Sequence, residues 1–170
     1  MKPLRHPDDL HLHAAQGWLH LGDPLEADKE LDEITPELRA HPAVLAVRCK
    51  VYVQAKKWDY VATVAETLVK MWPNEAQIWT QRSCALHELG RTQEAFDKLL
   101  PVAEKFPKVW TIPYNLSCYC AQLGRLDECQ TWFKKAMAID EHTVKQKAID
   151  DPDLKPLWDS MSGTMWKRSE

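Results

Sequence analysis

The fold is decided by residues 82–99, RSCALHELGRTQEAFDKL, whose pattern returns 34 residues later as residues 116–133, LSCYCAQLGRLDECQTWF. Their glycines, Gly90 and Gly124, are one such period apart, and Gly22 lies two periods upstream of Gly90. A fixed period near 34 residues is the signature of a solenoid built from helix pairs, in which no pair buries its apolar face alone. The sequence therefore predicts stacked helical hairpins and favours binding as the class of function.

Four repeats fit this period without insertion or deletion. We place them at residues 8–41, 42–75, 76–109 and 110–141, after an N-terminal extension at 1–7. Small side chains recur at the place where two helices of a pair should cross: Ala15, Cys49, Ser83 and Ser117. Larger apolar residues recur at other places, so that large side chains face small ones along the stack.

Local signals place the helix ends. Asp23 followed by a proline offers an N-cap and a first-turn proline, and the repeated glycines offer left-handed helix ends. The second repeat has Lys56 where the glycine should be. Two prolines near the end of the first repeat, Pro36 and Pro42, indicate an extra turn. Pro101 falls inside an expected helix and should split it between Lys98 and Leu100.

The period stops after Asp140, so we assign residues 142–170 to a C-terminal capping helix and a polar tail. A new helix is expected to start at Asp151-Pro152-Asp153, with an apolar stripe behind it formed by Leu154, Leu157, Trp158 and Met161. This stripe would cover the last hairpin, which is otherwise exposed to water. Docking of a partner on the same helix is the alternative, and Trp166 in the tail keeps it open.

The residues that recur at equivalent places of the four repeats resemble those of the tetratricopeptide repeat. The third and fourth repeats match most clearly, with Trp79, Leu86, Gly90, Ala95 and Pro107 at the family's characteristic places in the third. The second repeat departs from the pattern at Lys56, and the first has Arg39 where the terminal proline should be. The resemblance covers roughly residues 8–140 and is carried by recurrence rather than by any single residue. It implies an all-α, right-handed superhelical solenoid of helix-turn-helix hairpins, closed by the C-terminal capping helix.

The resemblance also implies a peptide groove on the concave side, lined by the first helix of each hairpin. Ala46 and Gln81 fall in the groove columns, and we select the following as its site residues: Gln16, Lys50, Gln54, Gln77, Thr80, Cys84, His87, Thr111, Tyr114, Asn115, Cys118 and Gln122. The basic carboxylate clamp of chaperone-binding family members is absent. We expect an extended segment of low net charge to bind between the third and fourth repeats, where Asn115 can pair with a peptide backbone and Tyr114 offers an amphipathic ring.

Composition limits the partners and the compartment. The chain has 170 residues, a net charge of −3 and 22 scattered Lys and Arg residues, which argues against nucleic acid. No apolar run is long enough to span a membrane, and the N-terminal residues lack the core of a signal peptide. Five cysteines in apparent helices are typical of reduced thiols, so we expect a cytoplasmic protein.

No catalytic, cofactor or metal site is predicted. His87-Glu88 begins like a zinc-protease helix, but Arg91 occupies the place of the second histidine. Phosphate-binding loops and nucleophile elbows need glycines that this chain does not supply. A metal held by Cys84, Cys118 and His87 is an alternative to the interpretation of these residues as small or polar groove side chains.

The sequence thus predicts a non-enzymatic module that binds an extended peptide or a partner helix in its groove. Two alternatives stay open: a small secretion-type chaperone, and a structural subunit that self-associates through Trp166 and the cap.

Overall fold

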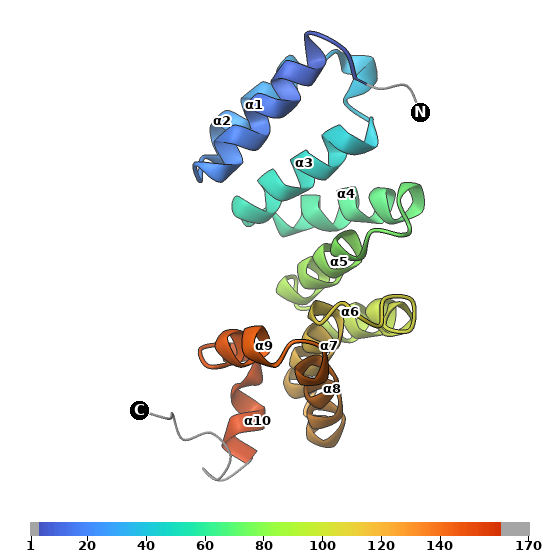
Figure 1. The fold of residues 1–170 in the computed structure, drawn as a ribbon, viewed down its shortest axis with the longest axis vertical. Coiled ribbons are helices and arrows are strands. Elements are labelled where there is room, and N and C mark those ends of the chain that lie inside the picture. Colours follow the sequence, from blue (N-terminus) through green and yellow to red (C-terminus); the bar gives the residue numbers. More distant parts are fainter. Residues whose placement is uncertain (1–3, 161–170) are drawn as a thin grey trace. The chain divides into compact units, whose positions relative to one another are not determined.

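The computed structural model describes residues 4–160, and within that range the chain is helical and contains no strand (Figure 1). The elements follow one another as α1 (Asp8–His20), α2 (Pro24–Glu33), η1 (Pro36–Leu38), α3 (Pro42–Gln54), α4 (Trp58–Met71), α5 (Ala76–Glu88), α6 (Thr92–Leu99), η2 (Leu100–Val102), α7 (Thr111–Gln122), α8 (Leu126–Ile139), α9 (Glu141–Ala148), η3 (Pro152–Leu154) and α10 (Lys155–Ser160). This arrangement confirms the predicted all-α class.

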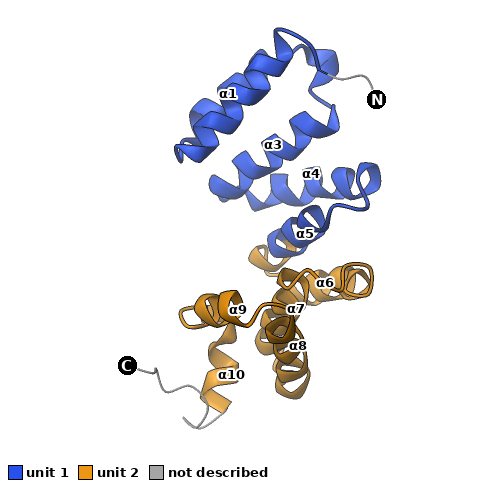
Figure 2. Ribbon diagram, viewed as in Figure 1, with its two compact units in different colours: residues 1–85 blue, residues 86–170 orange. Residues whose placement is uncertain are grey.

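The chain divides into two compact units, residues 1–85 and 86–170, and the boundary falls inside α5 (Figure 2). In unit 1 the helices pack as the pairs α1 with α2 and α3 with α4, and α2 also packs on α3. Small residues at the crossings, such as Ala15, Ala27 and Cys49, are fully buried. Close approach of the backbones there lets Leu31, Ile34 and their neighbours fill the interior.

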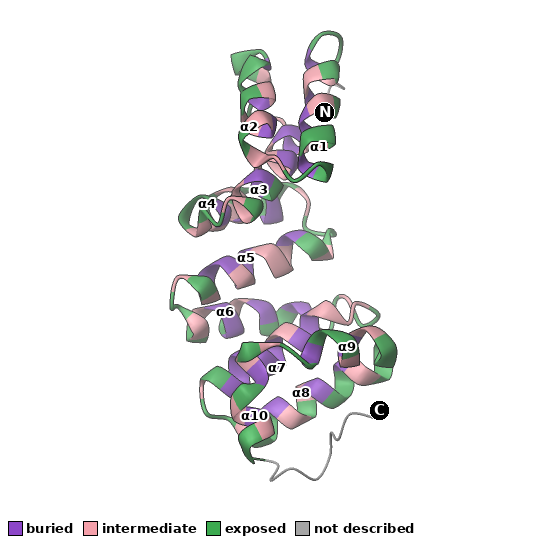
Figure 3. Ribbon diagram, turned by 90° about the vertical axis from the view of Figure 1, so that its left-hand side faces the viewer, coloured by how far each residue is buried: buried purple, intermediate pink, exposed green. Residues whose placement is uncertain are grey.

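Unit 2 is built around α7, which packs against α8, α6 and the C-terminal elements. Most of its residues are buried on every side (Figure 3), which explains a helix with apolar and small residues all round. Behind it, Leu154 of η3 and Leu157 of α10 are buried, and Trp158 places its ring edge-on against Phe133 of α8, with ring centroids 5.5 Å apart. The predicted cap therefore covers the last hairpin, while Met161 and Trp166 lie outside the described residues.

Several local predictions are confirmed. The Asp23 carboxylate accepts hydrogen bonds from the backbone amides of Leu25 and Glu26 at the start of α2. Pro101 ends α6 at Leu99, after which the chain continues as η2. The extra turn expected around Pro36 is η1.

One helix was missed. The sequence predicts a single new helix start at Asp151, but α9 begins ten residues earlier, directly after α8. Asp140 caps α9 by accepting a hydrogen bond from the backbone amide of Thr143 at 3.0 Å. Lys145 and Lys147 in its last turn also suit the helix dipole. These signals are local and carry no period, so the repeat pattern did not reveal them.

The helix pairs begin at Asp8, Pro42, Ala76 and Thr111, although the exact repeat boundaries stay a prediction. Among the described residues no helix is both long enough and apolar enough to cross a membrane.

Candidate functional site

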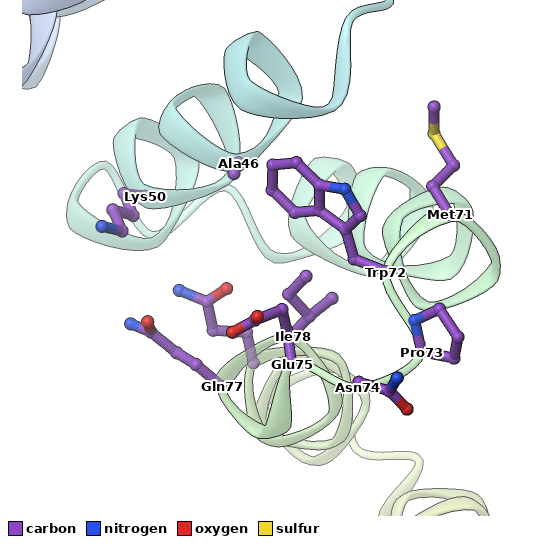
Figure 4. Close-up of a pocket in the computed structure, with 10 residues that line it drawn as sticks. Ala46, Lys50, Met71, Trp72, Pro73, Asn74, Glu75, Gln77 and Ile78 are labelled. Atoms are coloured by element: carbon purple, nitrogen blue, oxygen red, sulfur yellow. The ribbon is translucent and has the colours of Figure 1, made fainter. Parts of the chain in front are cut away.

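Unit 1 contains an open pocket of about 430 Å³ between α3, the α4–α5 connection and α5 (Figure 4). Its lining consists of Ala46, Lys50, Met71, Trp72, Pro73, Asn74, Glu75, Gln77, Ile78 and Gln81. Figure 4 shows the Trp72 indole extending toward Ala46 of α3, while Ile78 and Gln77 project from α5. The pocket therefore joins predicted groove residues from two successive first helices.

The wall formed by residues 72–75 is held by its own hydrogen bonds. The backbone amide of Trp72 donates to the carbonyl of Leu68 at 2.7 Å, which ends α4, and the amide of Glu75 donates to the carbonyl of Trp72 at 3.2 Å. The indole Nε1 of Trp79 donates to the carbonyl of Pro73 at 3.0 Å. The pocket is thus largely formed before any ligand arrives, which lowers the entropic cost of binding.

An arginine in the middle of α5 fixes this helix to α4. Arg82 is buried, forms an ion pair with Glu66 and places its guanidinium 5.9 Å from the centroid of the Trp79 ring. On the pocket side, Gln81 accepts a hydrogen bond from the Cys49 thiol at 3.6 Å. Burial raises the pKa of Cys49 to about 11, so the thiol stays protonated and keeps this contact at neutral pH.

The pocket has an apolar interior and a polar rim. Ile78 is buried and Trp72 is half-buried, whereas the side chains of Lys50, Asn74 and Gln77 are exposed at the edge. Lys50 and Glu75 carry opposite charges. Such a surface can hold an apolar side chain of a ligand and hydrogen-bond its backbone, and it offers no arrangement of nucleophile and base.

Three further predicted site residues of unit 1 make internal contacts. Gln54 Nε2 donates to the carbonyl of Leu19 at 3.0 Å, and the carbonyl of Gln16 pairs with His20 Nδ1 at 2.8 Å. The hydroxyl of Thr80 donates to the carbonyl of Gln77 at 2.8 Å. Sequence reasoning missed Trp72, Asn74 and Ile78, although a Trp-Pro pair close to a repeat junction is a signal that could have found Trp72.

In unit 2 the site residues of α7 lie against the chain's own C-terminal segment. The Tyr114 hydroxyl donates to Asp151 Oδ2 at 2.6 Å, and Gln122 Nε2 donates to the carbonyl of Asp153 at 2.8 Å. Tyr114 is only 1% exposed, and burial together with the bond to Asp151 raises its pKa above the ordinary value. The expected binding of a partner segment here stays a prediction, because this structure fills the position with its own residues.

His87, in the last turn of α5, contacts the same segment. Its Nε2 lies 3.2 Å from Asp153 Oδ2, and its Nδ1 lies 2.9 Å from the Thr92 hydroxyl. The hydrogen bond with Asp153 raises the pKa of His87 above its usual value, against the opposing effect of burial. Two further predicted site residues on α7, Thr111 and Asn115, are partly buried.

Among residues 4–160, one group has the donor atoms for a metal ion: Cys118, Asp151 and Asp153, whose ligand atoms lie within 4.8 Å of one another. Thiolate and carboxylate donors suit Zn²⁺. The Asp151 carboxylate, however, already accepts from the backbone amide of Asp153 at 3.1 Å and from Tyr114. These hydrogen bonds tie Asp151 to α7 and to the turn that follows it. Cys84 of the alternative metal hypothesis is not part of this group.

Comparison with known proteins agrees with the repeat pattern. The family model described as tetratricopeptide repeat matches residues 114–143, and no curated protein matches the chain. Among solved structures, MamA of strain MSR-1 is 22% identical with a TM-score of 0.71, covering 80% of this chain and 78% of that one. MamA residues 41 to the end from Desulfovibrio magneticus RS-1 are 19% identical with a TM-score of 0.72, covering 82% and 78%. These likenesses confirm the TPR-like helical solenoid fold.

Proposed function

We propose that this chain, a protein with tetratricopeptide repeats, is a non-enzymatic interaction module that binds an extended peptide or a partner helix of low net charge. The fold class is typically used for protein–protein interaction and scaffolding. The open pocket in unit 1 supports the proposal of peptide binding in the groove. Two of the groove residues selected from the repeat pattern, Lys50 and Gln77, line this pocket together with Trp72 and Ile78.

The chemistry of this pocket defines the ligand. Its volume of about 430 Å³ suits one or two apolar side chains of a peptide. The amides of Gln77 and Asn74 can each donate to and accept from a peptide backbone, which fixes direction without requiring a charge. Lys50 and Glu75 balance one another, so neither a strongly acidic nor a strongly basic ligand is favoured.

Cytoplasmic location is part of the proposal and is supported by the thiols. All five cysteines lie in the described part of the chain, and none of them forms a disulfide bond there. Burial raises the pKa of Cys120 to about 12 and that of Cys129 to about 11, so both stay protonated and behave as small apolar side chains. Their placement suits a reducing compartment.

The pocket is tested with peptides selected by phage display on the full chain, whose affinities are then measured by fluorescence anisotropy. Lys50→Glu combined with Gln77→Ala should weaken binding about tenfold, because it removes two rim contacts while the apolar interior stays intact. Lys134→Glu is the matched control, since it makes the same charge change at an exposed position of α8. Equal affinity for the wild type and the double variant would show that the peptides bind elsewhere.

The two alternative roles predict other results. A small secretion-type chaperone would co-purify with one unstable client protein rather than bind short peptides. A self-associating subunit would lose its oligomeric state in light scattering when the chain is truncated after Ser160, whereas a peptide-binding module would keep its affinity for the selected peptides.

A further inference from the structure

Three α7 residues, one helical turn apart, all meet the same short segment. Tyr114 binds the Asp151 carboxylate, Gln122 binds the carbonyl of Asp153, and the Cys118 sulfur lies within 4.8 Å of carboxylate oxygens of both aspartates. Positions four residues apart lie on one face of a helix. The segment therefore runs along the α7 face that the repeat pattern assigns to ligand binding.

A second helix also contacts the segment. His87 in the last turn of α5 contacts the Asp153 carboxylate at 3.2 Å, and its ring centroid lies 5.1 Å from that of Tyr119 on α7. With Tyr114 and Gln122, this gives three hydrogen-bonding side chains for two carboxylates and one backbone carbonyl. Hydrogen bonds to a carboxylate are among the stronger ones in proteins.

Two leucines anchor the segment beside these polar contacts. Leu154 and Leu157 are 0% and 1% exposed, and α10 packs on both α7 and α8. Removing both side chains from water stabilises the docked position of the segment. The pattern combines a short polar turn with two apolar anchors, which is how peptide ligands commonly bind grooves.

The segment owes its order to these contacts. η3 has three residues and α10 has six, and helices this short do not persist in water by themselves. The preceding residues Ile149 and Asp150 are exposed and lie outside any helix. Because tertiary contacts alone hold the segment in place, it can open as a local unit while α7 and α8 stay folded.

We propose that residues 151–157 are an intramolecular ligand of the α7 face, exchangeable for a partner segment with the same chemistry. That partner carries two acidic residues with one residue between them, as in Asp151 and Asp153. Two leucines follow and occupy the positions of Leu154 and Leu157. A segment without the leucines would leave apolar surface exposed, and one without the carboxylates would lose the contacts with Tyr114 and His87. This surface is additional to the pocket of unit 1 and does not depend on it.

The test uses the full chain and a labelled peptide with the sequence of residues 149–160, IDDPDLKPLWDS. Asp151→Asn with Asp153→Asn weakens the segment in the chain but keeps a side chain able to cap η3. The freed face should then bind the peptide at least about tenfold more tightly than the wild type does, because the competing tethered segment is weakened. Asp159→Asn is the control, since Asp159 is exposed and pairs with Lys155 within the same helix.

Two results would overturn the proposal. One is equal peptide binding by the wild type, the double variant and the control. The other comes from hydrogen exchange of the wild-type chain: residues 151–157 should exchange at lower protection than α7 and α8, and exchange of all three in one step would make the segment a fixed cap. The second measurement needs no variant, so it decides the question even if the double variant does not fold. Peptides selected for the pocket of unit 1 should bind the double variant unchanged, which separates the two surfaces.

Discussion

At the scale of single residues, one backbone conformation closes the turn inside each of the four helix pairs. Gly22, Gly90 and Gly124 have φ values of 79°, 75° and 73°, and Lys56 occupies the corresponding place with φ of 54°. A residue with a Cβ pays about 1 kcal/mol or more for this left-handed region, whereas glycine enters it freely. Lys56 is therefore strained where the sequence period predicts a glycine.

Lys56→Gly should raise the free energy of unfolding by about 1 kcal/mol, because it removes that strain. Gly90→Ala should lower it by a similar amount, and since an added Cβ at Gly90 would meet no atom within 4 Å, backbone strain is its sole cost. Urea denaturation of both variants measures the two changes in the free energy of unfolding. A loss of stability in Lys56→Gly would contradict the assignment of strain to this turn.

His87 gives the protein a predicted dependence on pH. Its pKa is raised first by the hydrogen bond with Asp153 and further by the charges of Asp153, Glu88 and Asp151, while burial opposes the shift. The Tyr119 ring and the Thr92 hydroxyl also face the imidazole. A raised pKa in the folded state means that the stabilisation is complete below the ordinary value of 6.5 and is lost as pH rises through the folded value.

The wild type should therefore lose more stability between pH 5.5 and pH 8 than His87→Gln does. Urea midpoints at the two pH values measure the difference, and glutamine keeps a hydrogen-bonding group without the titration. Identical pH dependence of the two proteins would mean that the contact between His87 and Asp153 contributes nothing to folding.

At the scale of elements, Arg48 links the first two helix pairs in unit 1. From α3 it reaches Asp28 and Asp32 on α2, each at 2.9 Å, and its side chain is only 14% exposed. Burial lowers the pKa of Arg48, but hydrogen bonding to Asp32 and Tyr52 and the charges of Asp28 and Asp32 together outweigh it and raise the pKa, so the guanidinium stays charged. The pairing joins helices of two successive repeats, a contact on which any stack of repeats depends.

Arg48→Ala should lower the free energy of unfolding by about 1 to 2 kcal/mol, because it leaves the partly buried Asp28 without its cation. Lys29→Ala removes a more exposed ion pair with Glu26 and should leave the free energy of unfolding nearly unchanged, because exposed ion pairs contribute little. Thermal unfolding of the two variants tests the contrast. An equal effect of both would show that burial adds nothing to the Arg48 contacts.

Helix ends were predictable from sequence where a local signal acts within one turn. The Asp23 cap, the break at Pro101 and the start at Asp151 all appear as predicted. The approach of Asp151 to Tyr114 could not be predicted in this way, because it joins residues 37 positions apart through the path of α9. Periodicity places side chains on a helix face, but it does not determine which later segment covers that face.

At the scale of the whole chain, the 34-residue period was sufficient for the fold class and only partly for the site. It placed Lys50 and Gln77 on first helices, and both line the pocket of unit 1. It could not supply Trp72 or Asn74, which belong to the connection between α4 and α5 and are positioned by hydrogen bonds of that connection. One part of the site therefore follows the 34-residue period and can be predicted from the sequence. The other part is the connection between α4 and α5, whose conformation is known only from the structure.

Binding of a partner peptide at the pocket of unit 1 is the central claim, and photo-crosslinking tests it most directly. A selected peptide carrying a benzophenone at its apolar anchor is irradiated on the full chain, and the attached residues are identified by mass spectrometry. The account predicts crosslinks within residues 46–50 and 71–81, which hold the pocket lining. Crosslinks confined to other parts of the chain would contradict it.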